Sequence, residues 1–151
     1  MGPVVFIVAS LGLLAAAPAG VVHKGLNVRV VAVDRAAEWT DDQKTFMVKP
    51  QAGQEVAVVQ VEFRATAEAK RFANANGFVE LKGLGLESSD GTKHDAVMTS
   101  LSLQAGDASP GTVFKQKIPV VIPKGAVLKA LVLGDTLVGV SENKPATKGR
   151  R

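Results

Sequence analysis

Residues 1–22 carry no charged side chain, whereas the residues after them alternate apolar and polar side chains between turns rich in Gly, Pro and Asp. Alternation with a period of two is typical of strands that bury one face. The chain has 151 residues, a length typical of one domain. We therefore expect an apolar leader at 1–22, one β-rich domain at 23–141 and a basic, flexible tail at 142–151.

The leader has two interpretations, a signal peptide or a retained membrane-anchor helix. Its end, Ala17-Pro18-Ala19, supplies the small residues that precede a cleavage site, here before Gly20. An uncleaved helix over residues 2–22 would be roughly 31 Å long, which is enough to cross a hydrocarbon core of about 30 Å. We favour the retained anchor and keep cleavage and secretion as the alternative.

Two sequence signals make opposite predictions about the side of the membrane on which the domain lies. Lys24 and Arg29 follow the leader and no Lys or Arg precedes it, so the positive-inside rule alone would leave the domain in the cytoplasm. The Ala-x-Ala end is a more specific feature of exported chains. We expect the domain on the periplasmic or extracellular side.

The domain is expected to be all-β and antiparallel. In the clearest strand, Glu55–Ala65, the residues Ala57, Val59, Val61 and Phe63 share one face. Gln60, Glu62 and Arg64 fall on the other face. Pro119 lies inside another apolar run, which indicates an edge strand or a bulge. Further strands are expected at 24–33, 78–86, 92–98, 112–122, 127–133 and 136–140, with a short one at 45–48. Seven or eight short strands between turn signals are typical of an antiparallel sandwich.

The connection from Asp34 to Gln54 is predicted to be a long loop, and loops of this length are often functional. It contains Trp39, Phe46 and Met47. If exposed, these side chains would be anchors for a protein partner, because Trp and Met are favoured at interface cores. If buried, they would pin the loop to the sandwich, and we favour burial. The acidic group in the same loop, Glu38, Asp41 and Asp42, lacks the spacing of a calcium loop and is expected to be solvated.

No catalytic, cofactor-binding or metal-binding residue is predicted. Cysteine is absent and only two histidines occur, His23 beside the leader and His94 on a hairpin. A metal site would need both histidines to join carboxylates such as Asp90 or Asp95, and their places in the chain make that unexpected. No G-x-S-x-G elbow occurs.

Three further features of the sequence do not indicate a binding site. Gly83-x-Gly85 is only a fragment of a phosphate-binding fingerprint and indicates a strand loosened for close packing. Nucleic acid is not expected as a partner, because the chain has no Tyr and one Trp and does not interleave basic and aromatic residues. The basic tail is expected to be a solvated terminus.

The order of motifs resembles a known kind of domain. An apolar leader precedes a Gly-Leu-x-Val-x-Val strand at 25–30, and a later strand ends in Ser-Asp-Gly at 89–91. Ser-Pro-Gly-Thr-Val-Phe at 109–114 then runs into Ile-Pro-Lys-Gly at 122–125. Over residues 24–141, this order is similar to exported bacterial immunoglobulin-like β-sandwich domains of the DUF4352 and MPT63-like kind. The resemblance implies an immunoglobulin-like sandwich and a non-enzymatic envelope protein, and it transfers no functional residue.

These observations predict a non-catalytic accessory or scaffolding subunit, anchored in a bacterial membrane through residues 1–22. It would act by contact with another membrane or envelope protein, with Trp39, Phe46 and Met47 as the candidate contact residues. The alternative is a secreted, soluble binding module for a small ligand or a cell-surface molecule. Neither hypothesis needs a cofactor.

Overall fold

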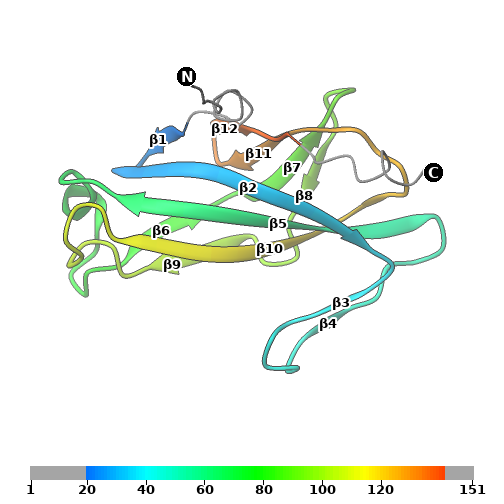
Figure 1. The fold of residues 1–151 in the computed structure, drawn as a ribbon, viewed down its shortest axis with the longest axis horizontal. Coiled ribbons are helices and arrows are strands. Elements are labelled where there is room, and N and C mark those ends of the chain that lie inside the picture. The colour runs from blue at the N-terminus through cyan, green and yellow to red at the C-terminus, as the bar shows by residue number, and fades with distance from the viewer. Residues whose placement is uncertain (1–19, 142–151) are drawn as a thin grey trace, which may run out of the picture.

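The computed structural model describes residues 20–141, which form antiparallel β-sheets (Figure 1). Within this range, helix is limited to one 3₁₀ turn, η2, at Ala69–Phe72. The strands are β1 (Val21–His23), β2 (Leu26–Ala36), β3 (Trp39–Thr40), β4 (Met47–Val48), β5 (Gln54–Ala65), β6 (Val79–Lys82), β7 (Leu84–Ser88), β8 (Lys93–Asp95), β9 (Ser100–Leu103), β10 (Val113–Pro123), β11 (Leu128–Leu133) and β12 (Thr136–Gly139).

The predicted leader and tail fall almost wholly outside the described residues, which exclude 1–19 and 142–151. Val21 and Val22 pair with Val28 and Asn27 in β1 and β2, so strand structure begins before the predicted domain boundary at residue 23. No helix between residues 20 and 141 is both long and apolar enough to span a membrane.

The first sheet has four strands in the order β1-β2-β5-β10. The alternation predicted for β5 is confirmed, because Ala57, Val59, Val61 and Phe63 are all buried. Strand β10 pairs with β5 in an unbroken register from Val113 to Pro123. The outward face of the sheet consequently carries the alternate residues of β5 and β10.

The second sheet has the order β12-β11-β7-β8, and β6 and β9 form a separate ladder. The single strand predicted over 78–86 is divided into β6 and β7 at Gly83, which has a φ of 67° that favours glycine. The return strand predicted over 92–98 is also too long, because β8 ends at Asp95 and residues 96–99 connect it to β9 without forming a strand. Strand β9 was not predicted.

The two four-stranded sheets share one core, in which side chains such as Phe63 and Ile118 of the first sheet and Leu86 and Leu131 of the second are fully buried. Burial of this kind contributes about 1.5–3 kcal/mol for each large apolar side chain. The shared core, drawn from strands far apart in the sequence, makes residues 20–141 one folded unit.

The sheets are also joined at both pairs of edges. On one side, Ala96 bridges Val120, and the Val97 N–H donates to the Pro119 carbonyl at 3.0 Å. On the other side, Nδ1 of His23 in β1 lies 2.9 Å from Oγ1 of Thr136 in β12. Because β10 is an edge strand of the first sheet, the prediction that Pro119 marks an edge is confirmed.

The region from Asp34 to Gln54 is the largest departure from the sequence prediction. Strand β2 continues to Ala36, and β3 and β4 then form a short hairpin. The short strand expected at 45–48 corresponds to β4, whereas its partner β3 was not expected. Figure 1 shows this hairpin standing apart from the two sheets. Only two residues of each strand pair, and so short a strand shows too little alternation to be recognised as a hairpin strand from the sequence.

Candidate functional site

The stem of the β3–β4 hairpin is held against the outer face of the first sheet by a small apolar cluster, separate from the main core. Val48 of the hairpin is buried with Val56 and Val58 of β5, and half-buried Trp39 and Val121 pack against them. Trp39 and Val48 also pair across the hairpin ladder. The apolar residues at 56 and 58, on the outward side of β5, are therefore explained by the hairpin that covers them.

The loop of the hairpin is organised by the carboxylate of Asp41. Its Oδ1 accepts the backbone N–H groups of Thr45 (2.7 Å) and Phe46 (2.8 Å), and its Oδ2 accepts the Thr45 hydroxyl at 2.7 Å. The hydrogen bond from the Thr45 hydroxyl, together with those two N–H groups, lowers the pKa of Asp41. Lys44 has a φ of 57°, a left-handed conformation that this hydrogen-bonded turn imposes.

The three candidate contact residues differ in their surroundings. Trp39 is half-buried in the stem, as the favoured interpretation predicted, whereas Phe46 and Met47 are 40% and 54% exposed. The burial expected for the group as a whole is therefore wrong for Phe46 and Met47. Met47 faces solvent because it alternates with buried Val48 along β4, and Phe46 lies where the loop joins that strand. Their role in partner binding stays a prediction.

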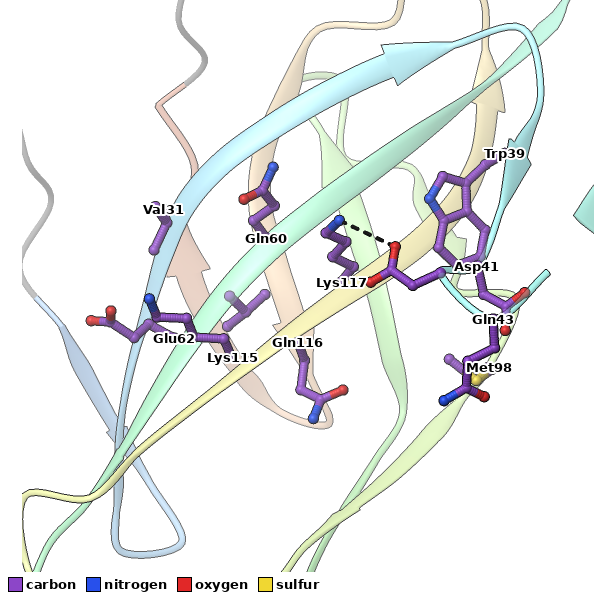
Figure 2. Close-up of a pocket in the computed structure, with 12 residues that line it drawn as sticks. Val31, Trp39, Asp41, Gln43, Gln60, Glu62, Met98, Lys115, Gln116 and Lys117 are labelled. Carbon is purple, nitrogen blue, oxygen red and sulfur yellow. Dashed lines mark ion pairs between the residues drawn. The ribbon is translucent and has the colours of Figure 1, made fainter. Parts of the chain in front are cut away.

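A groove of about 560 Å³ lies between the hairpin and the first sheet (Figure 2). The hairpin forms one wall, and strands β2, β5 and β10 form the floor. The exposed side chain of Met98, from the segment between β8 and β9, adds an apolar contact at the margin. The lining residues are Val31, Trp39, Asp41, Asp42, Gln43, Gln60, Val61, Glu62, Met98, Lys115, Gln116 and Lys117.

Most charges in the groove already have partners. The Lys117 Nζ lies 3.7 Å from Oδ1 of Asp42, across the groove. The Arg29 guanidinium donates to Glu62 at 2.9 Å and, against a smaller opposing effect of burial, lowers the pKa of Glu62. Lys115 lies close enough to contribute to that shift, but it forms no ion pair within the described chain.

The sequence placed Gln60 and Glu62 on the outward face of their strand but gave no sign of what covers that face. Lys115 and Lys117 were missed altogether. Their only sequence signal is an i, i+2 pair of lysines on the strand that contains Pro119. On an edge strand, lysines in this pattern typically prevent the strand from pairing with the same strand of a second copy.

A second hollow, near the β7–β8 turn, brings Ser88, Asp90 and His94 together. The Ser88 hydroxyl donates to Asp90 at 2.7 Å, and its oxygen lies 3.3 Å from Nε2 of His94. The acceptor nearest to this hydroxyl is a carboxylate, whereas an activated serine nucleophile is paired with an imidazole base. Asp90 also accepts the Thr92 N–H at 2.9 Å, which with the Ser88 hydroxyl lowers its pKa to about 2. The cluster therefore shapes a turn.

The residues considered as metal ligands do not converge. His23 is engaged with Thr136 of β12, and His94 with Ser88 of β7. Asp95 lies 3.5 Å from Lys93, and the carboxylate of Asp41 is occupied within its own loop. Between residues 20 and 141, no group of three or more His, Asp or Glu side chains could hold a metal ion.

Comparisons with known proteins assign no activity or ligand to the two hollows. No protein-family model matches the chain, and no curated protein does. A solved structure of a conserved hypothetical protein from Bacillus anthracis is similar over 81% of this chain and 92% of that one, with 14% identity and a TM-score of 0.48. The description of that protein states no activity or ligand.

Proposed function

We propose that this chain is an immunoglobulin-like β-sandwich domain on the extracytoplasmic side of a bacterial membrane, held there by residues 1–22. The anchor would be the apolar leader before β1, because Val21 and Val22 belong to that strand. The domain acts as a non-catalytic accessory or scaffolding subunit, by contact with another membrane or envelope protein. The two antiparallel sheets with one shared core support the sandwich part of the proposal.

The observation that carries the functional part is the β3–β4 hairpin. It combines an anchored side with an exposed apolar side, because Trp39 packs on the sheet while Phe46 and Met47 face solvent. We call Phe46, at the end of the loop, and Met47, the first residue of β4, the hairpin tip. A large apolar side chain on a preorganised loop is well suited to bind a partner, since little conformational entropy is lost on docking. Asp41 supplies that preorganisation.

A pull-down of the full chain from native membranes in mild detergent tests the proposal. The double variant Phe46→Ser and Met47→Ser should lose the co-purifying protein. Leu137→Ser is the matched control, because Leu137 is 47% exposed on β12, at a sheet edge away from the hairpin. Unchanged capture by the hairpin variant would contradict the proposal.

The groove supports a second candidate, a secreted module that binds a small ligand. Its volume of about 560 Å³ lies within the range of roughly 300–1,000 Å³ that is typical of small-molecule sites. Intact-mass measurement separates the two candidates. A membrane-bound chain that begins near Met1 supports the anchored subunit, and a soluble chain that begins near Gly20 supports the secreted module.

A further inference from the structure

The backbone of β10 presents its hydrogen-bonding groups to two opposite sides in alternation. The carbonyl of Thr112 accepts the Ala65 N–H of β5 at 2.9 Å, whereas the carbonyl of Pro119 accepts the Val97 N–H from the other side at 3.0 Å. Because the register with β5 has no shift, Val113, Lys115 and Lys117 face the same side as Pro119. That side is the edge of the first sheet.

Most of this edge is open. The segment after β8 covers it only at Pro119 and Val120. Within residues 20–141, nothing hydrogen-bonds to the outward backbone groups from Val113 to Lys117. Five residues of strand are long enough to direct the addition of another strand. The groove opens beside this segment, because Lys115, Gln116 and Lys117 are among its lining residues.

The charges on this edge decide between possible occupants. A second copy that paired β10 with β10 in antiparallel register, about Lys115 or about Gln116, would place lysine opposite lysine. Like charges directly opposite one another destabilise a strand pair, and edge lysines are a common means of preventing self-association. Lys115 has no ion pair within the described residues, and Lys117 has only the exposed pair with Asp42, which contributes little.

We propose that the edge of β10 from Val113 to Lys117 binds an extended acidic peptide segment of another protein as an added strand. Carboxylates at alternate positions of that segment lie opposite Lys115 and Lys117, and the outer-face side chains of the added strand extend over the groove. This inference rests on the proposed function, since it gives the chemistry of the partner. It adds a contact that the exposed hairpin tip does not itself make.

The first test measures binding of a fluorescein-labelled peptide, Thr-Glu-Val-Glu-Val-Glu-Thr, to the full-length protein by fluorescence anisotropy. The matched peptide with Gln in place of each Glu should bind at least about tenfold more weakly. The double variant Lys115→Glu and Lys117→Glu should reverse this preference in favour of a Lys-containing peptide. The control Lys129→Glu changes an exposed lysine of β11, an interior strand of the second sheet, and should leave binding unchanged.

The second test separates strand addition from simple charge attraction. Lys115→Pro removes an N–H that faces the open edge without removing a hydrogen bond to β5, in the same way as the natural Pro119 on this strand. Lys115→Ala is the matched control, because it removes the same charge but keeps the N–H. Lys115→Pro should bind the peptide more weakly than Lys115→Ala. In the unmodified protein, the peptide should slow hydrogen exchange at the amides of Lys115 and Lys117, which exchange quickly when it is absent.

The outcomes distinguish this inference from the proposed function. Failure of the Glu peptide to bind, or equal binding by Lys115→Pro and Lys115→Ala, overturns strand addition. Dimerisation of the unmodified chain through β10, detected by light scattering, also overturns it. In each of these cases, loss of the native partner from the Phe46 and Met47 variant would still support a scaffolding subunit that binds through its hairpin tip.

Discussion

The Nζ of Lys117 and Oδ1 of Asp42 lie 3.7 Å apart, so the edge strand of the first sheet and the loop of the β3–β4 hairpin face each other across one groove. The pair joins residues 75 positions apart in the sequence (117 − 42). Both side chains are substantially exposed, and such a pair stabilises a fold little. Its importance is spatial, because it places the hairpin tip and the open strand edge on one side of the molecule.

The first prediction concerns the order of the hairpin loop. Asp41→Ala should remove the acceptor for the Thr45 and Phe46 N–H groups and should accelerate their hydrogen exchange. Asp42→Ala is the matched control, since the neighbouring carboxylate accepts no hydrogen bond within the loop. Equal exchange in the two variants would show that Asp41 does not organise the loop.

The second prediction concerns the two apolar clusters. Trp39→Ala removes a half-buried side chain from the small cluster and should lower the free energy of unfolding by about 1–3 kcal/mol. Phe63→Ala creates a cavity in the main core and should cost about 3–5 kcal/mol. Urea denaturation followed by circular dichroism measures both. A larger loss for Trp39→Ala would mean that the hairpin is part of the main folding unit.

The third prediction concerns His23, which joins β1 to β12. Partial burial, with a smaller contribution from Lys24, lowers the pKa of His23 below 6.5. The unfolded chain therefore binds a proton at a higher pH than the folded chain. This contribution to stability is complete above about pH 6.5 and is lost as the pH falls through the lowered pKa. His23→Gln should flatten the dependence of the unfolding free energy on pH over this interval.

The fourth prediction concerns acid unfolding. The pKa of Asp90 is lowered from 3.8 to about 2 by hydrogen bonds from the Thr92 N–H and the Ser88 hydroxyl. Its contribution is complete above pH 3.8 and is lost as the pH falls toward 2. Asp90→Asn should reduce the pH dependence of thermal unfolding in this range. The exposed Asp107, which accepts no hydrogen bond within residues 20–141, provides a control as Asp107→Asn.

The sequence predicted the sheets better than the site, for a physical reason. The alternation in 55–65 and the proline at 119 report burial on one face and an edge position, which are local properties of a strand. Of the hairpin, only the strand at 45–48 was expected, and its partner at Trp39 and Thr40 was missed because each strand pairs through only two residues. Strand β9, with only four residues, was missed in the same way.

The groove could not be predicted because it depends on long-range contacts. Gln60 and Glu62 were placed correctly on the outward face of β5. The hairpin that covers part of that face is shown only by the apolar cluster in which Val48 meets Val56 and Val58. The lysines at 115 and 117 become informative once β10 is known to be an edge strand. Whether they can meet an added strand depends on the order of strands in the sheet, which cannot be read from the alternation of residues within one strand.

The most direct test of the central claim is site-specific photo-crosslinking of the full chain in its native membrane. A photoreactive phenylalanine analogue at Phe46, on the hairpin tip, should form an adduct with another envelope protein. The same analogue at Leu137, which is equally exposed on β12, should not. Equal adducts from both positions, or none from Phe46, would contradict a scaffolding role that is carried by the β3–β4 hairpin.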